Sequence, residues 1–144
     1  KYEGEIKRYP DDGQGSYYFS DGSKYVGEFS SGKKTRYGIF TYAAGGNYEG
    51  EWRGGKRHGY GIFKNSIGEV IKGIWSNDIN VEKAKKTDAR GFVWNGSFKN
   101  LQPDGLLRVK RPDYYFYDGI WSKGKMVRAL GVQGFEPKPF VINN

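Results

Sequence analysis

Three glycine–lysine segments have the spacing with which a phosphate-binding loop begins. Residues 27–33, 50–56 and 119–125 each place a glycine, four residues, a second glycine and a lysine. In a phosphate-binding loop, a Ser or Thr follows this lysine and a helix follows the loop. Here the next residues are Lys34, Arg57 and Met126, the first glycine lies within a predicted strand, and no helix is predicted. We therefore interpret the three matches as one repeated structural unit.

The other reactive side chains do not assemble into a catalytic or metal-binding set. His58 is the only histidine and the chain has no cysteine, so no second imidazole or thiolate can complete a nucleophilic or metal site. Asp11 and Asp12 form a carboxylate pair, but they lie in a predicted turn, where aspartate is common. His58 is likewise predicted to be a surface turn residue. The sequence thus predicts no enzyme activity, no metal ion and no cofactor.

Composition favours one domain of strands and turns. The 144 residues include 23 glycines and 17% aromatic residues, a combination that suits strands and turns better than helices. The formal charge of +8 is uneven, because residues 71–144 carry 13 basic and 7 acidic side chains while residues 1–70 carry 11 and 9. No apolar run approaches the ~20 residues of a membrane-spanning helix. The chain starts at Lys1, already inside a motif, so we expect a piece of a longer protein or a processed chain.

Five-residue blocks recur every 23 residues. They are YEGEI (2–6), YVGEF (25–29), YEGEW (48–52), IKGIW (71–75), WNGSF (94–98) and YDGIW (117–121). Such a period indicates an array of one supersecondary unit. We predict an array over 1–139, with units 2–24, 25–47, 48–70, 71–93, 94–116 and 117–139. Residues 135–144 form a predicted irregular C-terminal tail, because Pro137 and Pro139 cannot donate to a strand ladder.

Each unit alternates with the period of a β-strand. Tyr48, Gly50 and Trp52 point to one face, and the two glutamates between them point to the other. The glycine-rich stretch 54–59 predicts a hairpin turn, and a second turn near 66–69 leads into the next unit. The predicted fold is all-β: an open, single-layer antiparallel meander of six hairpins, about twelve strands, with the last units degenerate.

Large rings are expected to lie over glycines. If the hairpin is symmetric about 56–57, Trp52 faces Gly61 and Phe63 faces Gly50, so each ring shields a neighbouring backbone. Burying a ring contributes ~2–3 kcal/mol, which exceeds the ~0.5–1 kcal/mol that a glycine in a strand costs. A single sheet without a second layer depends on this arrangement.

Residues 48–61, YEGEWRGGKRHGYG, carry a resemblance to a known family. Their pattern, Y-x-G-x-W-x-x-G-x-x-x-G-x-G, resembles the MORN repeat (membrane occupation and recognition nexus). The resemblance is strong in units one to three and degenerate in units four to six. It implies a cytoplasmic assembly module of the kind found in cytoskeletal, ciliary and membrane-junction structures.

Two binding functions stay open, and nucleic-acid binding ranks behind both, because the aromatics occupy structural columns. The first is a protein-interaction scaffold that takes a helix or an extended peptide on its aromatic-glycine face. Its predicted contact residues are Tyr25, Tyr48, Trp52, Phe63, Trp75, Phe98 and Trp121, together with Ile74 and Ile120. The two isoleucines occupy the column that carries outward-facing glutamates in the first three units, so we expect a partner protein or the tail 135–142 to cover them.

The alternative is a membrane-surface module that binds anionic phospholipid. Lys33, Lys56 and Lys125 occupy one column of the first turn and are joined by Lys34 and Arg57. We expect these five side chains to form a basic ridge along one edge of the array. Near an anionic surface, each well-placed Lys or Arg contributes about 1 kcal/mol.

Overall fold

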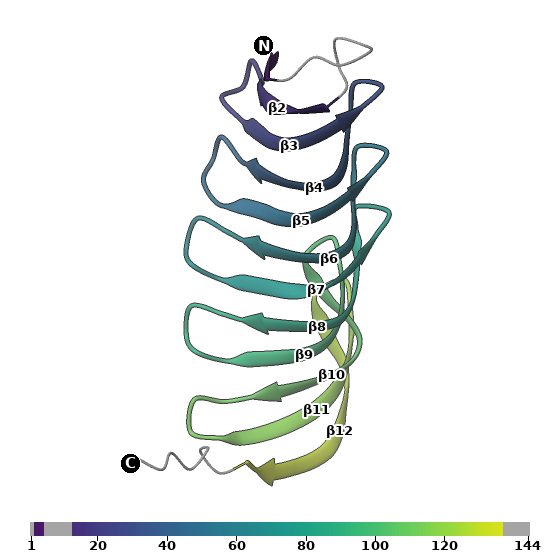
Figure 1. The fold of residues 1–144 in the computed structure, drawn as a ribbon. Helices are drawn as coiled ribbons and strands as arrows, with labels where there is room; N and C mark the ends of the chain where they lie inside the picture. The colour runs from purple at the N-terminus through teal and green to yellow at the C-terminus, as the bar shows by residue number, and fades with distance from the viewer. Residues whose placement is uncertain (1, 5–12, 137–144) are drawn as a thin grey trace, which may run out of the picture.

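The computed structural model describes residues 2–4 and 13–136, and these residues form a single twelve-stranded sheet (Figure 1). Its strands are β1 (Tyr2–Gly4), β2 (Gly13–Tyr18), β3 (Lys24–Ser30), β4 (Lys33–Thr41), β5 (Asn47–Arg53), β6 (Lys56–Lys64), β7 (Val70–Ser76), β8 (Asn80–Thr87), β9 (Val93–Lys99), β10 (Gln102–Lys110), β11 (Tyr115–Ser122) and β12 (Lys125–Phe135). Within the described ranges no helix is long and apolar enough to span a membrane.

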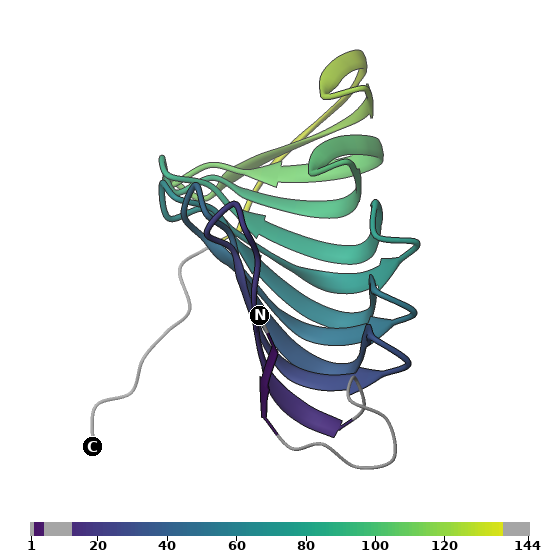
Figure 2. The same ribbon diagram turned by 90° about the horizontal axis from the view of Figure 1, so that it is seen from above.

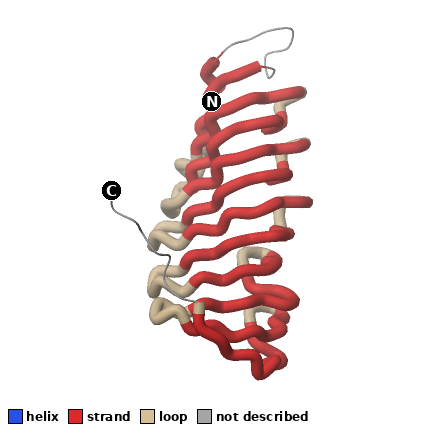
Figure 3. The backbone as a smooth tube through the Cα atoms, turned by 60° about the horizontal axis from the view of Figure 1, so that its bottom comes forward, coloured by secondary structure: helices blue, strands red, loops and turns tan. Residues whose placement is uncertain are grey.

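Each strand pairs antiparallel with its neighbours in the sequence, from β1 to β12. The strands stack as one layer along the length of the molecule (Figure 3). The predicted open meander of hairpins is therefore confirmed. The predicted tail 135–144 lies outside the described residues from 137 onward.

The hairpins close with tight turns repeated every 23 residues. Residues 31–32, 54–55, 100–101 and 123–124 are two-residue turns with positive φ at both positions, which is the type I′ geometry that fits strand twist. The turn between β7 and β8 has three residues, 77–79. The prediction of one turn over 54–59 is wrong, because residues 56–59 already belong to β6.

Residues 56–61 hold a β-bulge that shifts the register of this hairpin. Trp52 faces Arg57, but Gly50 faces Gly61, so two extra residues lie on β6. Gly59 takes φ +64° in this bulge, and a side chain there would collide with Glu51. A bulge bends its strand, and Figure 2 shows the sheet as one curved layer.

The predicted pairing of rings with glycines across the hairpin is wrong, because the bulge moves the register. Glycine faces glycine instead, in an unbroken row that runs from Gly4 on β1 through 15, 27, 38, 50 and 61 to Gly73 on β7. Aromatic residues face aromatic residues in the next row, as with Tyr48 and Phe63.

The rings nevertheless cover glycines, along a diagonal. A Cβ added to Gly61 would lie 2.2–2.4 Å from atoms of the Tyr48 ring, and the Trp75 indole N–H donates to the Gly61 carbonyl at 3.3 Å. Gly38 is held in the same way by Tyr25 and Trp52. Rings from two successive units thus enclose one glycine, and this contact connects unit two to unit three and unit three to unit four.

Two glutamates of the outward face complete the bulges. Glu51 accepts the backbone N–H of Tyr60 at 2.6 Å, and Glu28 accepts that of Tyr37 at 3.5 Å. Each amide belongs to a residue that the bulge leaves without a partner on the preceding strand. The glutamate of the repeat motif therefore has a structural role that alternation alone did not indicate.

Replacing Gly50 by valine should lower the free energy of unfolding by more than about 2 kcal/mol. Its Cβ would lie 2.5 Å from the Gly61 Cα and 2.6 Å from the Tyr60 carbonyl oxygen, and neither backbone atom can move without breaking the ladder. The matched control is Lys72→Ala on the exposed outward face. Urea unfolding that places both variants within about 0.5 kcal/mol of the wild type would contradict the packing account.

Candidate partner-binding groove

Rings of successive units pack edge to face on one side of the sheet, called here the ring face. The Trp52 ring lies 5.6 Å from Tyr25 and 5.0 Å from Tyr48, at interplanar angles of 89° and 82°. Tyr48 makes the same edge contact with Trp75 at 5.3 Å. Edge-to-face pairs add to the free energy of ring burial, so the ring face has a continuous core without a second layer.

The two buried phenols each donate a hydrogen bond to a backbone carbonyl three residues later in the same strand. The Tyr25 hydroxyl donates to the carbonyl of Glu28, and the Tyr48 hydroxyl donates to that of Glu51, each at 2.9 Å. Burial raises the pKa of both phenols. They therefore act as neutral donors in the core.

A recess of about 550 Å³ opens on the ring face. Its floor is aromatic, formed by Phe40, Trp52 and Phe63. Its two walls come from opposite ends of the strands, where one wall includes Ala44, Gly45 and Ser66 and the other includes Gly55, Asp78 and Leu101. Because turns from both ends of the strands line one recess, the curvature of the sheet creates it.

Arg57 is a paired cation at the edge of this recess. Its Nε lies 2.8 Å from Asp78 Oδ1, and its guanidinium carbon lies 4.6 Å from the centre of the Trp75 ring. The Tyr42 hydroxyl accepts a further hydrogen bond from Nη1 at 3.3 Å. Only 14% of the Arg57 side chain is exposed. The Arg57 guanidinium is therefore a largely buried part of the lining of the recess.

Lys34 is a second cation over the rings. Its Nζ lies 5.3 Å from the centre of the Trp52 ring and 5.5 Å from that of Phe40, with Phe19 and Tyr25 within 5.9 Å. Burial lowers the pKa of this ammonium, and Asp78 opposes the shift. In the described parts of the chain no ion pair joins Lys34 to a carboxylate.

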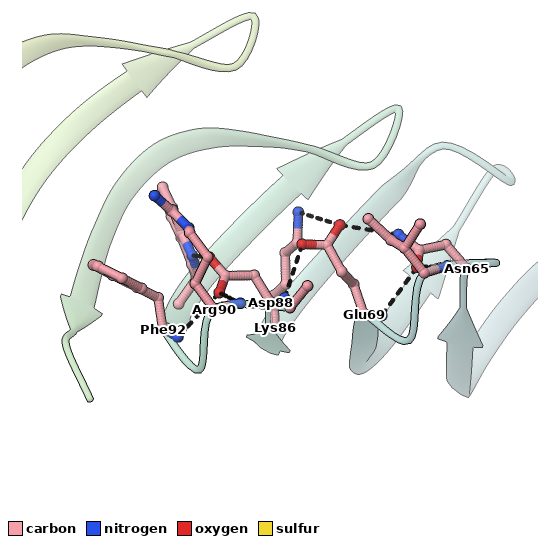
Figure 4. Close-up of polar contacts among 9 residues, drawn as sticks. Asn65, Glu69, Lys86, Asp88, Arg90 and Phe92 are labelled. Atoms are coloured by element: carbon pink, nitrogen blue, oxygen red, sulfur yellow. Dashed lines mark hydrogen bonds and ion pairs between the residues drawn. The ribbon is translucent and has the colours of Figure 1, made fainter.

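Polar side chains stabilise the longer turns at the other ends of the strands, away from the type I′ turns (Figure 4). Asp88 Oδ1 accepts two backbone N–H groups of its own turn, at 2.9 and 3.0 Å, and Oδ2 accepts the Trp94 indole N–H at 3.1 Å. Asn65 accepts two amides in the preceding turn, and Glu69 links Asn65 to Lys86. Residues 2–4 and 13–136 contain no group of three or more His, Cys, Asp or Glu that could hold a metal ion.

Most of the predicted contact rings are used by the sheet itself. Tyr25, Tyr48, Trp75 and Phe98 are at most 1% exposed, and Trp52 and Trp121 are at most 6% exposed. Phe63 is half-buried and lines the recess. On the outward face, Ile74 is 44% exposed beside Tyr60, while Ile120 is half-buried beside Leu106. Their contact with a partner stays a prediction.

The five predicted basic residues do not form one ridge. Lys33, Lys56 and Lys125 are exposed next to the hairpin turns, whereas Lys34 and Arg57 point to the ring face. Strand alternation explains the division, because neighbours in a strand face opposite sides. His58 lies half-buried in β6 beside the bulge, so its prediction as a surface turn residue is wrong.

Sequence reasoning missed Asp78 and Tyr42, the two partners of Arg57. Asp78 occupies the turn column that holds glycine in units two, three and six. The departure from glycine in this column was a signal that the repeat alignment could have exposed.

The sequence model of the MORN repeat matches residues 2–24, 25–47, 48–70 and 117–127, which together exceed half of the chain. No curated protein matches the chain. The matched repeats are consistent with a protein-binding or membrane-binding repeat module.

Replacing Asp78 by asparagine should destabilise the fold by about 1–3 kcal/mol, because it leaves a largely buried guanidinium without its counterion. Asparagine tolerates the positive φ at this turn position. Asp113→Asn is the matched control, since the Asp113–Arg111 pair is about half exposed and should change stability little. Equal urea midpoints for the two variants would show that the Arg57–Asp78 pair does not stabilise the groove.

Proposed function

Because the chain belongs to the MORN-repeat family, we propose that it is a non-catalytic interaction module that binds a helix or an extended peptide of another protein in the recess of its ring face. The module would serve as a subunit or domain of a larger cytoplasmic assembly, including cytoskeletal, ciliary or membrane-associated ones. The proposal assigns it no catalytic residue and no cofactor.

The observation that carries this proposal is the recess itself. Binding sites are typically concave, mostly apolar and supplied with a few convergent polar groups. Here half-buried rings, among them Phe40, Tyr42 and Phe63, form the apolar surface, and two cations and one carboxylate lie around it. A peptide side chain placed on these rings would add apolar burial that the sheet alone does not supply.

A random library of displayed 12-residue peptides tests the proposal on the whole chain without a known partner. The wild-type chain should retain binding peptides, and Ser66→Trp should lose them, because Ser66 is an exposed residue that lines the recess. Ile67→Trp is the matched control, since Ile67 is the next residue of the same turn, is 66% exposed and does not line the recess.

We expect the selected peptides to bind Ile67→Trp within about threefold of the wild type, which is less than 1 kcal/mol, and to bind Ser66→Trp at least tenfold more weakly. Equal binding to both variants would place the contact elsewhere. A wild-type chain that retains no peptide would contradict the groove as a peptide site.

The membrane alternative has one specific observation in its favour. Lys33, Lys56 and Lys125 are exposed at hairpin ends, where they could meet a flat anionic surface together. Each well-placed lysine would add about 1 kcal/mol to vesicle binding.

The corresponding prediction concerns a variant with all three lysines replaced by glutamine. If the chain binds vesicles containing phosphatidylserine, this variant should lose that binding and keep its urea midpoint, because the three side chains are exposed. Lys72→Gln with Lys85→Gln is the control for general charge, since these two residues pair on the outward face. Equal loss in the control would show that binding follows net charge and not the hairpin ends.

A further inference from the structure

Lys34 and Arg57 occupy the same position in successive hairpins. They are 23 residues apart, and each is the second residue after its type I′ turn. Both cationic groups lie over rings of the ring face, Lys34 over Trp52 at 5.3 Å and Arg57 over Trp75 at 4.6 Å. The repeat thus supplies two copies of one cation site, and each copy serves as a comparison for the other.

The two copies differ in their counterion. In the second copy, the next hairpin turn provides Asp78, which pairs with Arg57 at 2.8 Å. The residue 23 positions earlier, beside Lys34, is Gly55. The second turn has one more residue, but the backbone makes the same hydrogen bond in both copies. The Gly55 N–H donates to the Lys34 carbonyl at 3.0 Å, and the Asp78 N–H donates to the Arg57 carbonyl at 3.2 Å. Gly55 therefore occupies the position from which Asp78 pairs with Arg57 in the second copy, and it offers Lys34 no carboxylate.

Space is open at this place. A Cβ added to Gly55 would meet no atom within 4 Å, and both Gly55 and Lys34 line the recess. In the second copy, Arg57 contacts three rings and also pairs with Asp78. By comparison, Lys34 has the ring contacts without the ion pair. Among the described residues no carboxylate lies within ion-pair distance of Lys34, and Asp78 acts on it only from farther away. A half-buried ammonium in this state favours an anion that can enter the recess.

We propose that the recess binds an acidic side chain of a partner protein, whose carboxylate pairs with Lys34 in the place left open at Gly55 while flanking apolar residues rest on Phe40 and Phe63. This inference rests on the proposed function and specifies the chemistry of its partner. The partner segment therefore carries an Asp or Glu between apolar residues.

The shape of the site favours a peptide carboxylate over a lipid phosphate. Lys34 lies inside a recess walled by turns from both ends of the strands, which a flat bilayer surface does not enter. The exposed lysines at the hairpin ends are the groups that a bilayer would meet first. A peptide side chain, in contrast, can extend into the recess and bring apolar neighbours with it.

The experiment uses the peptides selected from the random library on the whole chain. The selected sequences should align on one Asp or Glu flanked by apolar residues. The strongest of these peptides is then synthesised with its acidic residue intact and with that residue changed to Asn or Gln. Fluorescence polarisation gives the affinity of both forms for the wild type and for Lys34→Gln. A charge-assisted contact predicts a 10- to 100-fold loss from either change and little further loss from both together.

The sister site supplies a matched pair of variants. Gly55→Asp copies Asp78 and should pair with Lys34 internally, so it should weaken the acidic peptide at least tenfold. Gly55→Asn has nearly the same shape and tolerates the same positive φ, but it brings no charge and should bind within about threefold of the wild type. Urea unfolding of both variants separates a change in the fold from a change in binding.

Each outcome decides between the two proposals. Selected peptides that lack a common acidic residue, or that bind Lys34→Gln as well as the wild type, overturn the carboxylate inference and leave the groove as a peptide site. Equal effects of Gly55→Asp and Gly55→Asn overturn it as well. A wild-type chain that selects no peptide, but binds phosphatidylserine vesicles through Lys34, overturns both proposals in favour of a lipid phosphate.

Discussion

The row of glycines across β1–β7 is the constraint on which the rest of the sheet depends. A single-layer sheet has no second layer to cover it, so its core must come from side chains that lie flat on their own sheet. Tyr48 can do this only because Gly61 has no Cβ, and Trp75 can reach the Gly61 carbonyl only across the same open position. Gly38 and Gly61 are therefore each enclosed by rings from two units, and stability is shared between neighbours, as in other repeat proteins.

The second half of the sheet meets the same constraint with different residues. On alternate strands after β7, the glycine row continues as Ala84, Leu107 and Ala129. Leu107 and Val81 are fully buried, and a Cβ added to Gly96 or Gly73 would meet their side chains at 2.6 and 2.7 Å, respectively. Aliphatic side chains therefore fill there the space that rings fill in the first units. This exchange explains why the repeat looks degenerate in sequence while the ladder stays continuous. The recess, in turn, lies over the glycine-rich part, where aromatic rings form the floor.

The sequence predicted the features that follow from period and alternation. A 23-residue period with a fixed glycine indicated the hairpins, and the alternation in 48–52 placed Tyr48 and Trp52 on one face. The register could not be predicted, because residues 54–59 combine a two-residue turn with a bulge at Gly59 and both use glycine. Arg36 takes positive φ at the equivalent place in the preceding hairpin, so the bulge does not even require glycine. The recess depends on this bend, so the position of Lys34 over the Trp52 ring in the lining of the recess followed only from the structure.

The chemical shifts of glycine Hα protons test the central claim most directly. Rings that lie flat over Gly38 and Gly61 must shift the Hα resonances of these residues upfield, and nuclear Overhauser contacts must join the Gly61 Hα protons to the Tyr48 ring. Gly54 and Gly68 are internal references, because no atom would lie within 4 Å of a Cβ added at either position. The account predicts upfield shifts at Gly38 and Gly61 alone among these four. Four similar shifts, without contacts to the Tyr48 ring, would contradict it.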